Sequence, residues 1–175
     1  MCNIKKPVLS YQLQRMSRKT EVLFVCLGNI CRSPGAEAVF QSMVEKEGLS
    51  SVISCDSAGI IGVHEGGPAD SRMQKHANLR GYNLLSIARK FNPLTDFDRF
   101  DFIIGMDEDN ISDLQRMTRS SKDSAKIYLM TDFCSSDKYI GVPDPYYGGS
   151  SGFELVLDLL EDGCENLLEH IKREI

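Results

Sequence analysis

A cysteine and an arginine stand six positions apart in the segment VCLGNICRSP, at Cys26 and Arg32, and Ser33 follows directly. A thiol attacks an electrophile only as the thiolate, and an ordinary cysteine is mostly protonated at neutral pH. A guanidinium is a planar fork that suits two oxygens of a phosphate group. Together these residues predict displacement at phosphorus by sulfur. Cys26 would be the nucleophile, Arg32 would bind the phosphate, and Ser33 would donate its hydroxyl to the sulfur.

The residues between Cys26 and Arg32 predict an anion-binding loop. A loop that joins a strand end to a helix N-terminus directs backbone N–H groups inward and adds the positive end of the helix dipole. We expect Gly28 and Asn29 to supply the unusual backbone angles of a tight curve. The alternative is a buried strand-end cysteine beside a surface arginine. The predicted phosphate-binding residues of the loop are Leu27, Gly28, Asn29, Ile30, Cys31 and Ser33.

The elements that would position this loop alternate along the chain. Apolar strand patterns are followed by helical patterns, which is typical of βαβ units and a parallel sheet. The sequence predicts a three-layer α/β fold, an open sheet of about four parallel strands with helices on both faces and the site at the strands' carboxyl ends. The expected strands are 21–25, 52–57, 102–106 and 126–130, and the expected helices are 33–48, 70–79, 108–117 and one that begins after 151.

Particular residues should begin and end these helices. Ser33 is expected to be the N-cap of the first helix, with Pro34 at its first helical position. Asp107 can cap the third helix, and Gly81 should end the second. In the last helix the apolar residues recur at helical spacing and should face the core. They are Phe153, Val156, Leu157, Leu160, Cys164, Leu167, Leu168 and Ile171.

Length and charge limit the class of protein. A chain of 175 residues fits one domain, which we place at residues 21–175. No apolar run approaches the roughly 20 residues that a membrane helix needs. The formal net charge of −5 disfavours a nucleic-acid binder that relies on diffuse positive charge. We therefore expect neither a nucleic-acid nor a membrane partner, and a monomer, with weak self-association as the alternative.

The first 20 residues and the cysteines bear on localisation. Residues 1–20 contain basic residues and no acid, so we expect a flexible basic extension, with an organelle-targeting peptide as the alternative. The six cysteines are too sparse for a disulfide scaffold and indicate reduced thiols and a cytoplasmic location. An organellar location is the alternative if the extension is a targeting peptide. Cysteine and histidine spacing shows no zinc pattern, so no metal is expected.

The segment VCLGNICRSP resembles the signature of the low-molecular-weight protein tyrosine phosphatases. The similarity continues in order through AEAVF, DSAG, GMDEDN and DPYYGG, over about residues 21–175. The resemblance implies a phosphatase I-like fold and hydrolysis of phosphotyrosine and small aryl phosphates through a phosphocysteine at Cys26. It also implies phosphotyrosine-containing proteins or peptides as partners, inorganic phosphate or vanadate as inhibitors, and no cofactor.

The resemblance further implies that Asp144, in PDPYYGG, protonates the leaving group and later activates a water molecule. Pro143 and Pro145 should stiffen this loop. Tyr146 and Tyr147 offer an aromatic wall for the substrate. From the residues alone, Asp-Pro followed by a glycine pair could equally be a simple turn.

Two further roles concern the loop. The resemblance implies that Ser57 hydrogen-bonds to Asn29 and shapes the loop; the alternative is a strand-terminal serine in water. Cys31 lies five residues from Cys26, so the two sulfurs could reach disulfide distance after oxidation. We expect Cys31 to be a redox-resolving partner, with a small packing residue as the alternative.

The sequence departs from the family pattern at three positions. Val63 and His64 occupy a stretch in which relatives often present an aromatic side chain. Ser86 stands where many animal members carry a histidine. Stacking on the substrate ring and support for the loop should differ accordingly.

Two related activities remain as alternatives. An arsenate reductase on this scaffold would need a close pair of downstream thiols, whereas Cys55, Cys134 and Cys164 are isolated in the sequence. Protein-arginine phosphatases usually carry a threonine at the position of Ile30. A phosphate-binding module without turnover is the non-enzymatic alternative, which the presence of cysteine, arginine and aspartate disfavours.

Overall fold

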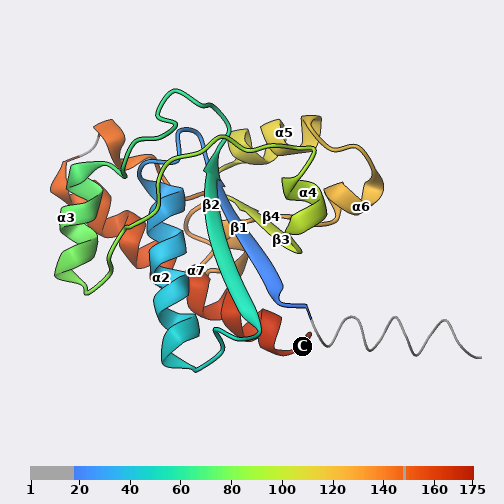
Figure 1. The fold of residues 1–175 in the computed structure, drawn as a ribbon. Coiled ribbons are helices and arrows are strands. Elements are labelled where there is room, and N and C mark those ends of the chain that lie inside the picture. The colour runs from blue at the N-terminus through green and yellow to red at the C-terminus, as the bar shows by residue number, and fades with distance from the viewer. Residues whose placement is uncertain (1–17, 148) are drawn as a thin grey trace, which may run out of the picture.

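A sheet of four parallel strands organises the fold (Figure 1). The computed structural model describes residues 18–147 and 149–175, without the side chain of Tyr147. The strands are β1 (Thr20–Cys26), β2 (Ile53–Gly59), β3 (Phe102–Gly105) and β4 (Ile127–Leu129). Their order in the sheet, β2-β1-β3-β4, confirms the prediction of about four parallel strands. β2 continues to Gly59, beyond its predicted end, and β4 is shorter than predicted.

Helices cover both faces of the sheet, so the predicted three-layer α/β architecture is confirmed (Figure 1). One face carries α2 (Arg32–Lys46), α3 (Ser71–Leu79) and α7 (Ser150–Lys172). The other face carries α4 (Asp96–Arg99) and α5 (Glu108–Arg116), followed by α6 (Ser121–Ser124). The sequence did not predict α4 or α6, because four residues are too few for apolar periodicity to be visible. Two 3₁₀ turns are η1 (Met130–Phe133) and η2 (Pro145–Tyr147).

The central strand β1 is buried on both faces. Val22 and Phe24 belong to the larger core, between the sheet and helices α2 and α7. Leu23 and Val25 belong to the smaller core, beneath α4 and α5. All four side chains are fully buried. Because close packing on both sides leaves β1 little freedom, its carboxyl end holds Cys26 in a fixed position.

Most of the expected helix ends are confirmed. Asp107 caps α5, since its carboxylate accepts a hydrogen bond from the backbone N–H of Asn110 at 2.8 Å. Asp70 precedes α3 and accepts from the N–H of Arg72 at 2.9 Å. Gly81 follows α3 with a φ of 87°, a left-handed conformation that glycine adopts without steric cost. The eight apolar positions predicted to face the core from α7 are all buried.

The predicted capping role of Ser33 was wrong. α2 begins at Arg32, its N-cap is Cys31, and no side chain caps it. Ser33 lies inside the first turn and is fully buried, and its hydroxyl contacts Cys26 and Asn29 instead. The N–H groups at the start of α2 therefore remain available to an anion.

The start of the described chain is attached to the domain. Residues 1–17 of the expected extension lie outside the described residues. Arg18 forms an ion pair with Asp101, and the Lys19 amine donates to the carbonyl of Ser50 at 2.7 Å. Thr20 already belongs to β1. In the described part of the chain, no helix combines the length and the apolar character needed to cross a bilayer.

Candidate active site

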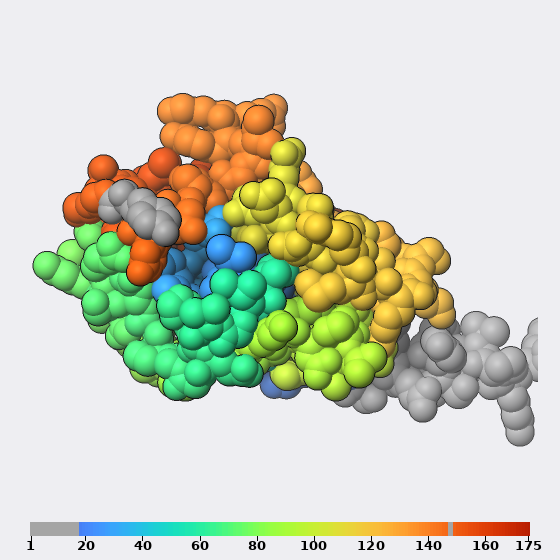
Figure 2. All heavy atoms as spheres, turned by 90° about the horizontal axis from the view of Figure 1, so that it is seen from above, coloured from blue at the N-terminus to red at the C-terminus, as the bar shows by residue number. Residues whose placement is uncertain are grey.

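A cavity of about 250 Å³ opens where the loops at the carboxyl ends of the strands converge. In Figure 2 the blue atoms of the β1–α2 segment lie at the floor of a hollow between the teal loop after β2, the yellow segment around α5 and the orange segment before α7. The cavity brings the predicted nucleophile, arginine and acid together. Its lining residues are Cys26, Leu27, Gly28, Ile30, Cys31, Arg32, Ile61, His64, Asp144 and Tyr146.

The sulfur of Cys26 lies at the base of this cavity. Cys26 is the last residue of β1 and is 4% exposed. Its Sγ atom is 3.0 Å from Oγ of Ser33. Ser33 comes from the first turn of α2, so the helix both covers the thiol and supplies a hydroxyl to it. This hydroxyl is placed to stabilise negative charge on the sulfur.

Several backbone carbonyls of the loop accept hydrogen bonds from neighbouring segments. The carbonyl of Cys26 accepts from the N–H of Ile60 at 2.9 Å, and that of Ile30 accepts from the N–H of Asp70 at 2.7 Å. Within the described residues, the N–H groups of residues 27–31 donate to no other group. A loop with bound carbonyls and unused N–H groups is suited to an anion.

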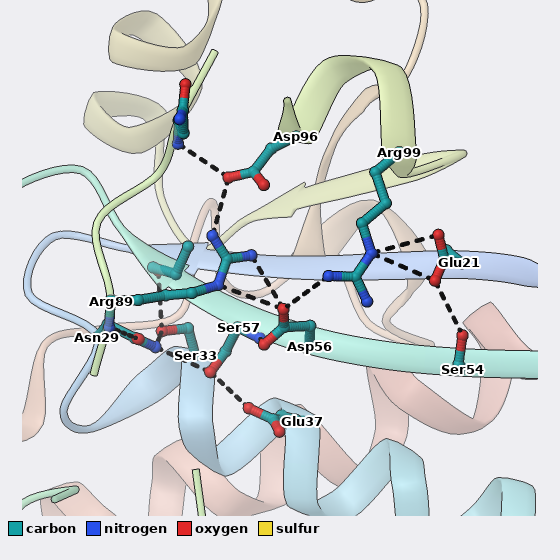
Figure 3. A network of polar contacts seen from close by, with 12 residues as sticks. Glu21, Asn29, Ser33, Glu37, Ser54, Asp56, Ser57, Arg89, Asp96 and Arg99 are labelled. Atoms are coloured by element: carbon teal, nitrogen blue, oxygen red, sulfur yellow. Dashed lines mark hydrogen bonds and ion pairs between the residues drawn. The ribbon is translucent and has the colours of Figure 1, made fainter. Parts of the chain in front are cut away.

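Asn29 makes the hydrogen bond to Ser57 that the resemblance implied, and two further contacts beside it. It is buried and has a φ of 55°, a left-handed conformation that asparagine tolerates better than most residues. Its side-chain amide donates to Oγ of Ser33 at 2.9 Å and to Oγ of Ser57 at 2.8 Å. Its Oδ1 atom accepts from the backbone N–H of Arg89 at 2.9 Å (Figure 3). The three contacts tie the loop to β2, α2 and the segment before α4.

The glycine at position 28 has a different role from the predicted one. The described residues with positive φ are Asn29 and three glycines outside the loop, so unusual backbone angles do not explain Gly28. A Cβ atom at Gly28 would lie 3.1 Å from Cδ2 of His64. A Cβ atom at Gly59, the last residue of β2, would lie 3.0 Å from the backbone carbon of Gly28. Missing side chains therefore let the loop, β2 and the imidazole pack closely.

Arg32 contacts both carboxylates of the site. Its side chain is only 4% exposed, pairs with Asp107, and lies 3.4 Å from Oδ2 of Asp144. It also donates to the carbonyl of Val142 at 3.1 Å. Burial alone would lower the pKa of Arg32, but the nearby Cys26 sulfur and the Asp107 carboxylate together raise it above its ordinary value. The guanidinium therefore stays charged although it is buried.

Asp144 lies at the mouth of the cavity. Its side chain is 44% exposed, and Oδ1 accepts from the backbone N–H of Tyr146 at 3.0 Å. Oδ2 faces Arg32, so one oxygen is held by the loop and the other is directed into the site. Tyr146, the predicted aromatic wall for the substrate, is 41% exposed and lines the cavity. The predicted contribution of the Tyr147 side chain lies outside the described residues.

Cys31 lines the same cavity as Cys26 but is not a candidate nucleophile. Burial and the negative charge of Asp70 raise the pKa of Cys31 to about 12. Cys31 is therefore protonated at neutral pH, when a nucleophile would need to be ionised. This thiol remains available to react with an oxidised sulfur nearby.

Several residues of the site were not singled out as site residues from the sequence. Asp107 was expected only as a helix cap, yet the same carboxylate also holds Arg32. Glu37 accepts from Oγ of Ser57 at 2.5 Å, and the same Oγ accepts from the side-chain amide of Asn29 (Figure 3). Glu37 lies within AEAVF, four residues after Ser33. An acidic residue among apolar helix positions was the signal that could have indicated a role for Glu37 at the site.

Arg89 supports the loop from outside the cavity. Its guanidinium donates to Asp56 at 3.0 Å and to Asp96 at 2.9 Å, and these contacts fix the position of the N–H that binds Asn29 (Figure 3). Burial alone would lower the pKa of Arg89, but the two aspartates raise it. Burial raises the pKa of Glu37, and the neighbouring Ser57 and Ser86, the latter a departure from the family pattern, act against this rise.

The two departures in the loop after β2 have different positions. His64 lines the cavity and packs beside Gly28. Val63 is 76% exposed, and it is not among the residues that line the cavity. Among residues 18–147 and 149–175 there is no group of three or more His, Cys, Asp or Glu side chains that could hold a metal ion.

Comparison with known proteins places the chain in a family. A family profile described as low molecular weight phosphotyrosine protein phosphatase matches residues 21–175. The low molecular weight protein-tyrosine-phosphatase YfkJ of Bacillus subtilis is 42% identical, over 87% of this chain and 96% of its own. A crystal structure of a protein tyrosine phosphatase from Entamoeba histolytica is 47% identical, with a TM-score of 0.86, over 89% of this chain and 99% of that one.

A Drosophila arginine phosphatase has a similar structure, with a TM-score of 0.80 and 32% identity, over 86% of this chain and 97% of that one. The profile covers the nucleophile loop (residues 27–31, the phosphate-binding loop between Cys26 and Arg32), the acid loop (residues 142–147, which contain Asp144) and the elements between them. The chain therefore belongs to the low molecular weight phosphotyrosine protein phosphatase family and is a cysteine-dependent hydrolase.

Proposed function

We propose that the protein hydrolyses phosphotyrosine in proteins and peptides, and small aryl phosphates, through a phosphocysteine intermediate on Cys26. The observation that carries the proposal is the convergence of three groups in one cavity: a thiol at the floor, the guanidinium of Arg32, and the carboxyl group of Asp144 at the mouth. The unused loop N–H groups surround the place where a phosphate would lie.

In the first step the Cys26 thiolate attacks phosphorus and a P–S bond forms while the bond to the tyrosine oxygen breaks. The protonated Asp144 gives its proton to the departing oxygen, which leaves as the phenol. Arg32 and the loop N–H groups hold the three equatorial oxygens, where charge is greatest in the transition state. Its two carboxylate partners keep Arg32 oriented before the substrate enters.

In the second step water attacks the phosphorus of the phosphocysteine, and the P–S bond breaks. Asp144, now ionised, takes a proton from the attacking water, and inorganic phosphate leaves. The sulfur departs as a thiolate, and the Ser33 hydroxyl 3.0 Å away supports the charge that returns to it. Inorganic phosphate and vanadate should inhibit, because both occupy the same anion-binding loop.

The rim of the cavity supports an aromatic substrate. Leu27, Ile61 and Tyr146 are 44%, 38% and 41% exposed and line the cavity together. These apolar side chains can contact the two sides of a phenyl ring whose phosphate reaches the floor. Because Val63 is exposed and does not line the cavity, the contact with the substrate ring should come mainly from Tyr146.

Cys31 fits the proposed redox role. It lines the cavity beside Cys26, and burial keeps it as a neutral thiol. Oxidation of the Cys26 thiolate by a peroxide would give a sulfenic acid, and the Cys31 thiol could then form a disulfide with release of water. This reaction would protect Cys26 from irreversible oxidation.

A protein-arginine phosphatase is the second candidate, because the similar Drosophila structure is that of an arginine phosphatase. The side chain of Ile30 lines the cavity and is larger and less polar than the threonine that we associate with arginine phosphatases. Arsenate reduction is less well supported, since Cys55 and Cys134 do not line the cavity and each donates to the backbone carbonyl of a residue that does not line it either. Three measurements would rank the activities. They are phosphate release from phosphotyrosine, phosphate release from phosphoarginine, and thiol oxidation that depends on arsenate.

The test of the proposal is Cys26→Ser, with Cys55→Ser as the matched control. Cys26→Ser should abolish release of phosphate from a phosphotyrosine peptide while vanadate binding, measured by calorimetry, persists. Cys55→Ser should retain turnover, because Cys55 lies on β2 outside the cavity. Appreciable turnover by Cys26→Ser would overturn the nucleophile assignment.

A further inference from the structure

We propose that Arg72 is a positioning residue for the acid loop and that, with Asp70, it links the phosphate-binding loop to Asp144. The inference rests on the proposed function, because it concerns how Asp144 is held for proton transfer. Arg72 does not line the cavity. It lies in the first turn of α3, between the nucleophile loop and the η2 turn.

One end of the link is attached to the phosphate-binding loop. The backbone N–H of Asp70 donates to the carbonyl of Ile30 at 2.7 Å. The Asp70 carboxylate then accepts two hydrogen bonds from the side chain of Arg72, from Nε at 3.1 Å and from Nη2 at 2.8 Å. This two-point contact fixes the plane of the guanidinium. Hydrogen bonds from Arg72 also hold the pKa of Asp70 below its usual range.

The other end of the link is attached to the acid loop. The Nη1 atom of Arg72 donates to the backbone carbonyl of Tyr146 at 3.0 Å. The guanidinium carbon lies 5.0 Å from the centroid of the Tyr146 ring and 5.2 Å from that of Phe153. Phe153 is a buried residue of α7, so it gives the guanidinium a fixed surface on which to rest.

The contact with Tyr146 bears directly on the proposed acid. The N–H of Tyr146 donates to Oδ1 of Asp144, while its carbonyl accepts from Arg72. Both backbone groups of this one residue are thus engaged, one by the acid and one by the link. With Oδ1 held, Oδ2 of Asp144 is left facing Arg32 and the cavity. Loss of Arg72 should let the acid loop move while the phosphate-binding loop stays in place.

An isolated ion pair of this exposure would matter little. The Arg72 side chain is 46% exposed, and exposed ion pairs commonly contribute little to stability. Arg72 differs in that three of its nitrogens are bound in fixed directions, to two segments that are far apart in the sequence. Its effect should therefore fall on the geometry of Asp144 rather than on overall stability.

The test compares Arg72→Met with Arg116→Met on aryl phosphates with good and poor leaving groups. Arg116 is exposed on α5, and its partners among the described residues all belong to its own helix, so it is a matched control. For Arg72→Met, kcat/KM for phenyl phosphate should fall about tenfold or more and that for 4-nitrophenyl phosphate by less than about threefold, because only the poor leaving group needs the acid. Arg116→Met should change neither value.

Two further measurements separate this role from others. The inhibition constant of vanadate should stay unchanged in Arg72→Met, since the phosphate-binding loop keeps its own contacts. Asp70→Asn retains the oxygen that caps α3 but loses the charge that orients Arg72, so it should show the same leaving-group dependence to a smaller degree. In the double variant the two losses should not add, because the residues act through one link.

Three outcomes would overturn the proposal. Equal losses on both substrates, or a parallel loss of vanadate affinity, would place the effect in the phosphate-binding loop. A change confined to KM for acidic phosphopeptides would make Arg72 a substrate contact. If the leaving-group dependence were unchanged in Arg72→Met but steeper in Asp144→Ala, the link through Arg72 would be refuted. The proposed function would stay intact. If Asp144→Ala also left it unchanged, the acid assignment itself would fail.

Discussion

The hydroxyl oxygen of Ser33 lies 3.0 Å from the sulfur of Cys26, inside the first turn of the helix that the loop enters. A serine at this position was expected to cap α2. The helix instead begins without a side-chain cap, and the hydroxyl is used at the sulfur. The contact favours a charged sulfur both before attack and when the P–S bond breaks.

Ser33→Ala should therefore slow breakdown of the phosphocysteine more than its formation. A hydrogen bond to a charged group contributes about 1.5–3 kcal/mol, so turnover should fall about 10- to 100-fold. Rapid quenching during turnover of 4-nitrophenyl phosphate should show that phosphoenzyme accumulates. Ser112→Ala, at an exposed position on α5, is the control. An equal fall in vanadate affinity and turnover would point to a damaged loop and contradict the assignment.

Asp107→Asn should weaken catalysis without unfolding α5. An asparagine can still accept the capping hydrogen bond from the N–H of Asn110, but it no longer carries the charge that orients Arg32. We expect kcat/KM to fall about tenfold, because a poorly oriented guanidinium binds the equatorial oxygens less well. Steady-state kinetics and a thermal unfolding curve measure the two effects. Asp109→Asn, exposed in the same helical turn, should change neither, and an unaltered kcat/KM in Asp107→Asn would refute the role.

The nucleophile loop could be predicted from sequence because its residues are contiguous. Strand, cysteine, loop, arginine and helix follow one another directly between residues 20 and 46, so local rules suffice to place Cys26 near Arg32. Asp144 was found only through the resemblance, since Asp-Pro before glycines is also an ordinary turn. Its approach to Arg32 joins residues that are 112 positions apart.

The supporting residues could not be identified in the same way. Arg72, Arg89 and Asp107 act through partners on other elements, and their own sequence neighbourhoods resemble solvated helix ends. Which arginine meets which carboxylate depends on how α3 and the segment before α4 pack, and apolar periodicity does not encode this. The same limit explains the error at Ser33, where a tertiary contact replaced the local preference for a cap.

The difference in the free energy of unfolding between Glu37→Gln and the wild type should shift in favour of the variant as the pH rises. Burial raises the pKa of Glu37 above its usual value, although the hydrogen bond from Ser57 and the nearby Ser86 oppose this. The folded state therefore favours the protonated form. The stabilisation that the protonated carboxyl group gives is complete below about pH 4.3, the pKa of glutamate in the unfolded chain. It is lost as the pH rises through the higher pKa of Glu37 in the folded protein. Glutamine is neutral at every pH and avoids the loss.

Urea unfolding of both proteins between about pH 4 and pH 7 measures this difference. The free energy of unfolding of Glu37→Gln minus that of the wild type should increase across the range. Glu45→Gln, at an exposed position on the same helix, should show a flat difference. A flat or falling difference for Glu37→Gln would mean that the carboxylate is stabilised in the folded protein by its neighbours.

Alkylation by iodoacetamide at neutral pH should modify Cys26 before any other described cysteine. The reagent reacts with thiolates, and burial raises the pKa of Cys31 to about 12 and that of Cys134 to about 11, so both remain thiols. Cys26 has the Ser33 hydroxyl and the unused loop N–H groups to favour its ionised form. Inorganic phosphate should protect it by occupying the loop.

Trypsin releases Cys26 and Cys31 on one peptide, residues 20–32, so fragment ions from tandem mass spectrometry must assign the label. We expect a single modification at Cys26, slowed by phosphate and accompanied by loss of turnover. Cys31→Ser should leave this labelling unchanged but allow irreversible oxidation of Cys26 by hydrogen peroxide, because no neighbouring thiol then captures the sulfenic acid. Preferential labelling of Cys31, or labelling that phosphate does not slow, would be incompatible with a thiolate at the base of an anion-binding loop.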